Sequence, residues 1–300
     1  MDLGRDGHQR GAGVGTGFQE KQLRLPDGRM LRCVLAGDGK PLVVFEAGIG
    51  AGASMWVTVQ RRVAERTRTL SYDRAGYGSS DDDSQPRSLE RLAGDLAAIL
   101  EMVEPNSSPV VVGSSMGASI LHVFAEAHPE RVAGLVLVDA AVGDVLRDRQ
   151  LRVVRTMFAI LATLSRVGLH KPLRRAMVRA ATAGMPTADR ELLLRDLTAK
   201  RTLRAAAREA RQLSQVPTLA QILAGLPDIP VGAVVGERAD RGEVKGRAAM
   251  VDLFRSAMRS HPRGRFVGAS RSGHFIPWQE PELVAEAIWG MVQTVRGNDA

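Results

Sequence analysis

The sequence predicts an α/β fold, in which helices flank a mostly parallel β-sheet and a further block of helices is inserted near the middle of the chain. Short apolar runs alternate with amphipathic stretches, which is typical of βαβ units. Most strand candidates are continuous apolar runs, as expected when both faces of a sheet are covered. The alternation stops between residues 143 and 226, where the chain is helix-forming throughout.

The elements follow in order from a leading hairpin, Glu20–Leu25 and Met30–Leu35, joined by the turn residues Pro26-Asp27-Gly28. Buried strands are predicted at Leu42–Phe45, Thr69–Tyr72, Val110–Val112, Leu135–Val138, Val231–Val235 and Arg265–Val267. Helices are predicted at Met55–Arg66, Leu89–Val103, Met116–Ala127, Arg247–Arg259 and Pro281–Val295. We therefore expect a core of residues 18–142 and 227–300, a helical cap insertion at 143–226, and a disordered Gly-rich tail at 1–17.

Composition limits the class of protein and its partners. The net charge of +8 is local, because residues 143–226 hold 16 Lys/Arg against 6 Asp/Glu. Aromatic residues make up only 4% of the chain, and the basic segment has no set of stacking residues interleaved with its arginines, since Phe158 is its one aromatic residue; a nucleic-acid partner is therefore not expected. No apolar run is long enough for a membrane span. With the single cysteine Cys33 and no apolar leader, a cytoplasmic protein is predicted, and the sequence indicates no oligomeric state.

A G-x-S-x-G pentapeptide supplies the candidate nucleophile. Gly113-Ser114-Ser115-Met116-Gly117 follows a β-branched run and precedes a predicted helix. A serine on such a sharp strand-to-helix turn exposes its hydroxyl near the helix N-terminus, and small residues must flank it. Only Ser115 has glycine at both −2 and +2, so Ser115 is predicted to be the nucleophile.

Serine needs a base, and His274 is the best placed of the six histidines. It follows the last predicted strand, and active sites of α/β proteins form at the carboxyl ends of parallel strands. An acid must orient its ring, and Asp240, after Val231–Val235, is the first choice because it keeps the order serine, acid, histidine. Asp139, at the end of Leu135–Val138, and Glu237 remain alternatives.

The motifs together resemble those of the α/β-hydrolase superfamily, in its serine esterase/lipase-like form with a helical cap. Tyr72-Asp73-Arg74-Ala75-Gly76-Tyr77-Gly78-Ser79-Ser80 resembles the D-x-x-G-x-G-x-S turn after the family's fourth core strand. Trp278-Gln279-Glu280-Pro281 resembles the start of its last helix. With the serine and histidine elements, the resemblance extends from about Phe18 to Val295.

The resemblance also implies an oxyanion hole. Gly48 matches the glycine of the family's His-Gly pair, so the backbone N–H groups of Ile49 and Met116 are the expected donors. Ala47 stands where the family usually has histidine, which changes the side-chain support of this loop. The glycines of this loop, residues 48–53, also loosely match a dinucleotide fingerprint, but the loop follows a strand in the wrong position of the fold. Neither a cofactor nor a metal is expected.

The sequence thus predicts a hydrolase that cleaves a carboxylic ester, or a related acyl bond, of a small apolar substrate through an acyl-enzyme. A thioesterase, a carbon–carbon bond hydrolase and a perhydrolase remain alternatives on the same fold, and a weakly catalytic or non-catalytic ligand receptor is an alternative of another class. The stretch Leu151–Leu169 has a broad apolar face and a basic flank. This pattern predicts a helix that packs onto the core; the alternative is a helix that lines an apolar substrate channel and contacts anionic lipid transiently.

Overall fold

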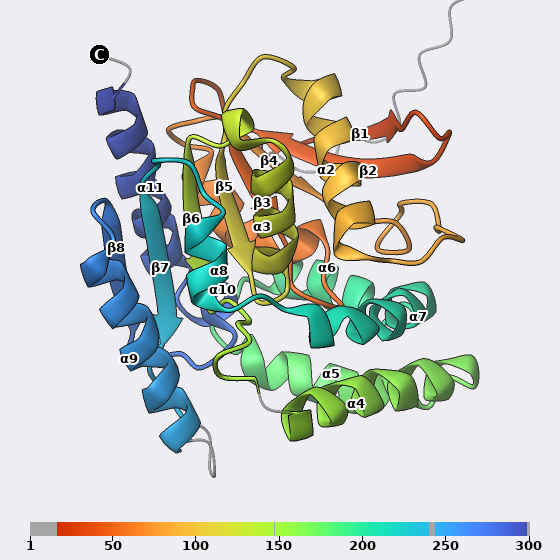
Figure 1. The fold of residues 1–300 in the computed structure, drawn as a ribbon. Coiled ribbons are helices and arrows are strands. Elements are labelled where there is room, and N and C mark those ends of the chain that lie inside the picture. Colours follow the sequence, from red (N-terminus) through yellow and green to blue (C-terminus); the bar gives the residue numbers. More distant parts are fainter. Residues whose placement is uncertain (1–16, 147, 240–243, 299–300) are drawn as a thin grey trace, which may run out of the picture.

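The structure is a computed structural model that describes residues 17–146, 148–239 and 244–298 (Figure 1). Its centre is an eight-stranded sheet in the order β1-β2-β4-β3-β5-β6-β7-β8. The antiparallel pairs are β1 with β2 and β2 with β4, and the remaining neighbours are parallel. The strands are β1 Gln19–Arg24, β2 Met30–Ala36, β3 Val43–Glu46, β4 Thr69–Tyr72, β5 Val110–Ser114, β6 Gly134–Val138, β7 Val231–Gly236 and β8 Gly264–Ala269. The predicted fold class is confirmed.

Helices cover both faces of the sheet, which explains why its strands are continuous apolar runs. Alternate residues of a strand point to opposite faces. Val43 packs in one apolar cluster with α1 and α11, whereas Val44 packs in a second with α2, α3 and α9. These helices are α1 Val57–Val63, α2 Leu89–Val103, α3 Gly117–Ala127, α9 Val244–Ser260 and α11 Pro281–Asn298. The helix predicted over Met55–Arg66 is in fact the short η1 Ala53–Trp56 followed by α1.

The inserted segment forms a layer of helices at the edge of the sheet where the parallel strands end (Figure 1). Its elements are α4 Asp148–Arg166, α5 His170–Ala181, α6 Thr187–Leu197, α7 Lys200–Glu209, η3 Ala210–Gln215 and α8 Leu219–Ala224. The short helices η2 Pro129–Arg131 and α10 Ile276–Gln279 belong to the core. Phe158 and Leu161 of α4 are buried, so one face of that helix packs inward. In the described part of the chain, no helix is long and apolar enough to span a membrane.

Candidate active site

Ser115 lies on a sharp turn between β5 and α3. Its backbone φ is 52°, in the left-handed region, and the only other non-glycine residue with positive φ in the described ranges is Asp139, with φ 42°. Such a conformation costs about 1–3 kcal/mol and tends to be kept where function requires it. The Ser115 N–H donates to Val138 O at 3.2 Å, and Ala141 N–H donates to Ser115 O at 3.1 Å. The two strained residues are therefore fixed on neighbouring turns.

The two glycines that flank Ser115 are required by close packing. A Cβ at Gly113 would lie 2.8 Å from Leu121 Cδ1 and 2.9 Å from Ala118 N. A Cβ at Gly117 would lie 2.6 Å from Glu46 O and 2.9 Å from Ala47 O. The first glycine lets α3 approach the strand, and the second lets α3 begin against the backbone of the loop after β3. The glycines of the pentapeptide thus bring the serine turn next to that loop.

His274 is held by Asp139. The ring Nδ1 of His274 lies 2.8 Å from Asp139 Oδ2. Asp139 directly follows β6 and is buried, whereas the His274 side chain is 47% exposed. Because Asp139 is adjacent to the residues that hydrogen-bond to Ser115, the serine, the carboxylate and the imidazole converge on one edge of the sheet. This edge is the one to which the parallel strands point.

The other contacts of Asp139 favour its charged form. Oδ1 accepts hydrogen bonds from Gly236 N at 3.0 Å and from Arg247 Nη1, on α9, at 2.7 Å. Burial raises the pKa of Asp139, but the hydrogen bond and charge of His274, the charge of Arg247 and the Gly236 N–H outweigh burial and lower it. An ionised carboxylate can only accept hydrogen bonds, so Nδ1 of His274 is the donor and Nε2 is left as the basic nitrogen. The sequence reasoning did not anticipate Arg247.

The three carboxylates weighed as the acid have different surroundings. Asp240, the first choice, lies outside the described residues. Glu237 pairs with Arg255 on α9, at 3.1 Å, and among the described residues it forms no hydrogen bond or ion pair with His274. Asp139, one of the two alternatives, is the carboxylate that contacts His274 among the residues that the structure describes. We therefore assign the role of acid to Asp139 in the proposal below.

The loop after β3 lies against Ser115. A Cβ at Gly48 would be 3.2 Å from Ser115 Cβ and 3.9 Å from its Oγ. In the described part of the chain, neither the Ile49 nor the Met116 backbone N–H donates a hydrogen bond, while the neighbouring Gly50 N–H donates to Tyr77 Oη at 3.1 Å. Two backbone donors next to the serine hydroxyl are what an oxyanion hole requires.

Arg74, from the turn after β4, supports this loop in place of the family's histidine. Its Nη1 donates to Ala47 O at 2.7 Å, and its Nη2 donates to Gly48 O at 3.0 Å. The same guanidinium pairs with Glu46 on β3 and, at 2.9 Å, with Glu209 at the end of α7. All of the side chains in these ion pairs are fully buried. The loop backbone is thus fixed by a charged group rather than by an imidazole.

Glu209 joins the inserted helices to this cluster. It also pairs with the buried Arg87 and accepts a hydrogen bond from Tyr77 Oη at 2.5 Å. Burial raises the pKa of Glu209, but the charges of Arg74 and Arg87 outweigh burial and lower it to about 2. For Glu46, burial dominates and raises its pKa despite the charge of Arg74. We call Glu46, Arg74, Tyr77, Arg87 and Glu209 the buried charge cluster.

The described residues near this site were compared with what a metal ion or a dinucleotide would need. No group of three or more His, Cys, Asp or Glu residues there could hold a metal ion. In the glycine-rich loop after β3, Asp73 approaches Gly52 closely, and its Oδ1 accepts a hydrogen bond from Ala53 N at 2.8 Å. Phe158 of α4 lies against Gly50. The loop is therefore packed against protein on these sides.

Comparison with known proteins identifies the family to which this chain belongs. The family model described as "Alpha/beta hydrolase family" matches residues 43–287, which include the serine turn, Asp139 and His274. The chain belongs to the alpha/beta hydrolase family. A thermophilic esterase from Thermogutta terrifontis has a similar structure, with a TM-score of 0.70 and 21% identity over 92% of this chain and 99% of the esterase. A putative aryl esterase from Burkholderia cenocepacia has a TM-score of 0.67 and 25% identity over 93% of this chain and 100% of its own.

Relatives found by sequence similarity match a smaller part of this chain than the two esterase structures do. A putative carbamate hydrolase, RutD, from Azorhizobium caulinodans is 36% identical over 103 residues, which are 34% of this chain and 38% of the relative. A non-heme chloroperoxidase from Streptomyces lividans is 33% identical over 104 residues, 34% of this chain and 37% of the relative. The chain thus spans less than two-fifths of the length of these two relatives, so their names do not fix its substrate.

Proposed function

We propose that this chain is a serine hydrolase that cleaves a carboxylic ester, or a related acyl bond, of a small apolar substrate. The observation that supports this most is the 2.8 Å contact of His274 Nδ1 with buried Asp139, beside a serine held at φ 52°. The esterases with a similar fold are consistent with it. Residues 143–226 are proposed to act as a cap over this edge of the sheet, with Phe158 as part of its apolar lining.

In the proposed mechanism, Ser115 Oγ attacks the carbonyl carbon of the ester while His274 Nε2 takes the hydroxyl proton. Asp139 holds the ring through Nδ1 and stabilises the imidazolium that forms. The Ile49 and Met116 N–H groups stabilise the oxyanion. The C–O bond to the leaving alcohol then breaks, and His274 returns the proton to that alcohol. Water, deprotonated by His274, releases the acid from Ser115 in the second half of the reaction.

The test compares two adjacent serines in the hydrolysis of short-chain p-nitrophenyl esters. Ser115→Ala should lower kcat/KM by about 10⁴-fold or more, because the nucleophile is lost. Ser114→Ala is the matched control, since Ser114 Oγ is buried without a hydrogen-bond partner, and it should keep most of the activity. Full activity of Ser115→Ala would refute the assignment.

The same preparations distinguish the alternatives. A thioesterase would show a higher kcat/KM for a thioester than for the oxygen ester of the same acyl group. A carbon–carbon bond hydrolase or a perhydrolase would show little ester turnover but would still react with a fluorophosphonate at Ser115. A non-catalytic receptor would leave Ser115 unlabelled by that probe. A labelled serine and rapid ester turnover together are the outcome that we expect.

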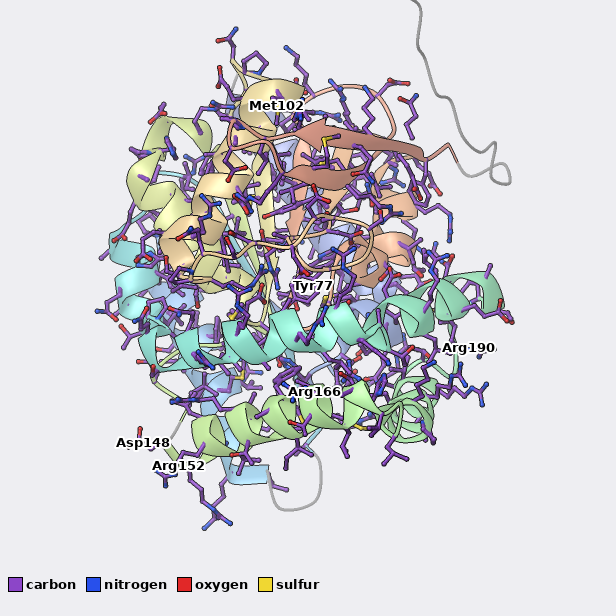
Figure 2. All side chains as sticks on the ribbon, turned by 90° about the vertical axis from the view of Figure 1, so that its right-hand side faces the viewer. Tyr77, Met102, Asp148, Arg152, Arg166 and Arg190 are labelled. Carbon is purple, nitrogen blue, oxygen red and sulfur yellow. The ribbon has the colours of Figure 1, made fainter. Side chains whose placement is uncertain are left out.

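We further propose that α4 makes a transient contact with anionic lipid, which is part of the alternative that the sequence Leu151–Leu169 left open. Val153, Met157 and Ile160 recur at helical spacing on its outer face and are 61%, 37% and 53% exposed. Figure 2 shows Arg152 directed outward from the same helix. Exposed apolar side chains flanked by arginines are typical of helices that lie on a membrane surface. Met157→Asp should reduce the fraction of protein that sediments with vesicles containing phosphatidylglycerol, and an unchanged fraction would contradict this contact.

A further inference from the structure

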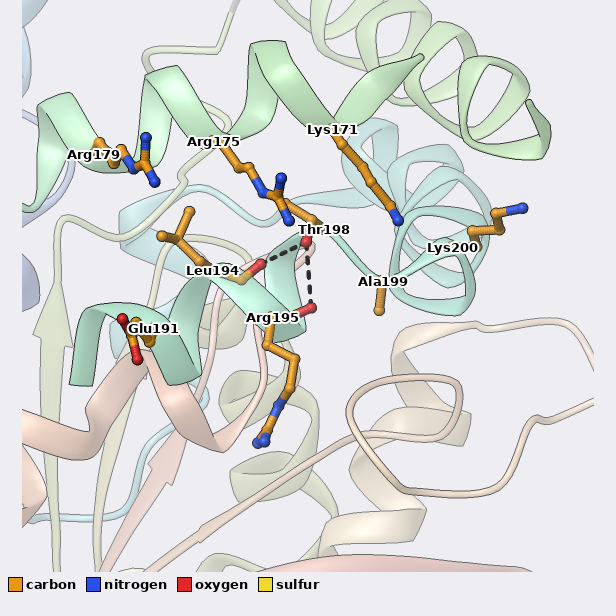
Figure 3. Close-up of a pocket in the computed structure, with 9 residues that line it drawn as sticks. All are labelled: Lys171, Arg175, Arg179, Glu191, Leu194, Arg195, Thr198, Ala199 and Lys200. Atoms are coloured by element: carbon orange, nitrogen blue, oxygen red, sulfur yellow. Dashed lines mark hydrogen bonds between the residues drawn. The ribbon is translucent and has the colours of Figure 1, made fainter. Parts of the chain in front are cut away.

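A cleft in the inserted helices concentrates positive charge. It lies between α5 and α6 and has a volume of about 710 Å³ (Figure 3). The charged side chains that line it are Lys171, Arg175, Arg179, Arg195, Lys200 and Glu191. Five of these six are cationic. Ser115, Asp139 and His274 do not line the cleft, so its chemistry is separate from the acyl transfer proposed above.

Three of the cations come from one face of a single helix. Lys171, Arg175 and Arg179 are four residues apart on α5, and Figure 3 shows them directed from α5 toward α6. Like charges at this spacing repel each other and cost a helix about 0.2–0.5 kcal/mol per pair. In the described ranges, none of these three side chains forms an ion pair or a hydrogen bond. Their mutual repulsion is therefore not compensated within the chain.

The remaining charged residues of the cleft do not neutralise them. Arg195 Nε lies 3.4 Å from Asp196 Oδ1, and Lys200 Nζ donates to Arg166 O at 3.2 Å. Glu191, the single carboxylate in the lining, forms no ion pair in the described part of the chain. The cleft thus has an excess of four positive charges. A ligand with several negative charges would relieve this repulsion and gain charge-assisted hydrogen bonds from the guanidinium groups.

We propose that this cleft binds a molecule that bears phosphate groups. Guanidinium groups match phosphate oxygens in geometry, and a phosphate group supplies up to two negative charges in a small volume. The volume of about 710 Å³ is in the range of small-molecule sites. The phosphate group belongs either to a soluble organic phosphate or to a phospholipid headgroup. Both sources share the recognition chemistry, and the experiment below separates them.

Binding of inorganic pyrophosphate, measured by isothermal titration calorimetry on the full chain, tests the site. In the cleft variant Arg175→Gln/Arg179→Gln, the affinity for pyrophosphate should fall by about tenfold or more. A tenfold loss corresponds to about one lost charge-assisted hydrogen bond. The matched control Arg152→Gln/Arg155→Gln changes the net charge equally on α4, outside the cleft, and should stay within about twofold of the wild type. Circular dichroism should show both variants folded, because all four arginines are exposed.

Two results would overturn the proposal. One is that the wild type does not bind pyrophosphate at millimolar concentration, and the other is that both variants weaken binding equally, which would indicate nonspecific attraction to a basic surface. Ester hydrolysis is measured on the same samples. Because the cleft contains no residue of the proposed triad, a wild type that hydrolyses esters but does not bind pyrophosphate would refute only the cleft. A wild type that binds pyrophosphate but does not hydrolyse esters would refute only the esterase.

Vesicle sedimentation then identifies the source of the phosphate. Vesicles of phosphatidylcholine with phosphatidylglycerol are compared with vesicles of phosphatidylcholine alone. If the source is a lipid headgroup, the wild type binds the anionic vesicles, pyrophosphate competes for part of this binding, and Arg175→Gln/Arg179→Gln loses the part for which pyrophosphate competes. If the source is soluble, the cleft variant loses pyrophosphate binding but sediments with anionic vesicles as the wild type does.

Discussion

Arginine has opposite surroundings in two regions of this molecule. In the buried charge cluster, Arg74 and Arg87 are each 3% exposed or less and share Glu209. In the cleft between α5 and α6, Arg175 and Arg179 are exposed and have no acidic partner among the described residues. A buried charge must be paired, because an unpaired one costs several kcal/mol, whereas an exposed charge is stabilised by water. Arg74 and Arg87 therefore have a structural role, whereas the guanidinium groups of Arg175 and Arg179 are available to bind a ligand.

The buried arginines and the arginines of the cleft also differ in role: the buried ones position the loop after β3, whereas those of the cleft are proposed to bind a ligand. The buried arginine Arg74 contacts the carbonyl oxygens of Ala47 and Gly48, so it fixes the loop that is proposed to present the Ile49 N–H. Glu209 anchors that arginine from the end of α7. The inserted helices and the oxyanion loop are thus linked through charges that do not reach solvent. Substitutions in the buried charge cluster should therefore lower the stability of the fold and also disturb the loop after β3.

The largest effect expected from this comparison is that of Glu209→Ala. It leaves two buried guanidinium groups without their shared carboxylate, which should lower the free energy of unfolding by about 3–5 kcal/mol. Glu191→Ala removes the same chemical group from the exposed cleft and should change it by less than about 0.5 kcal/mol. Urea denaturation measures both. Equal losses in the two variants would show that the buried cluster has no special role.

A smaller effect is expected in the pH dependence of stability. The pKa of Glu209 is lowered from 4.5 to about 2 in the folded state. A carboxyl group whose pKa is lower in the folded than in the unfolded state stabilises the fold at any pH above the unfolded-state pKa. This contribution is lost as the pH falls through the folded-state pKa. The difference in unfolding free energy between the wild type and Glu209→Gln should therefore be constant above about pH 4.5 and decrease from there toward pH 2. A difference that does not change with pH would contradict the lowered pKa.

Much of the candidate site could be predicted from local pattern. The strand, the G-x-S-x-G pentapeptide and the helix that follows it indicate Ser115, and the element Ser272-Gly273-His274 after the last strand indicates His274. Both signals depend on residues close in sequence. The fold class followed in the same way from the alternation of apolar runs and amphipathic stretches.

The acid and the charge cluster depend on contacts that local pattern does not contain. In the sequence, Asp139 directly follows β6 and Asp240 comes shortly after β7, and these two strands are adjacent and parallel. Local pattern therefore favours neither, and the contact between Asp139 and His274 is visible only in the structure. Glu209 is one of six acidic residues in a basic segment, and its partners Arg74 and Arg87 lie more than a hundred positions earlier. No periodicity predicts such a pairing.

The most direct test of the central assignment compares Asp139→Asn with Asp240→Asn in the hydrolysis of a short-chain p-nitrophenyl ester. Asp139→Asn should lower kcat by about 10⁴-fold, the loss typical when the acid of such a triad becomes an amide. Asp240→Asn should leave kcat within about twofold, with both variants folded by circular dichroism. A large loss in Asp240→Asn with near-normal turnover in Asp139→Asn would contradict the account.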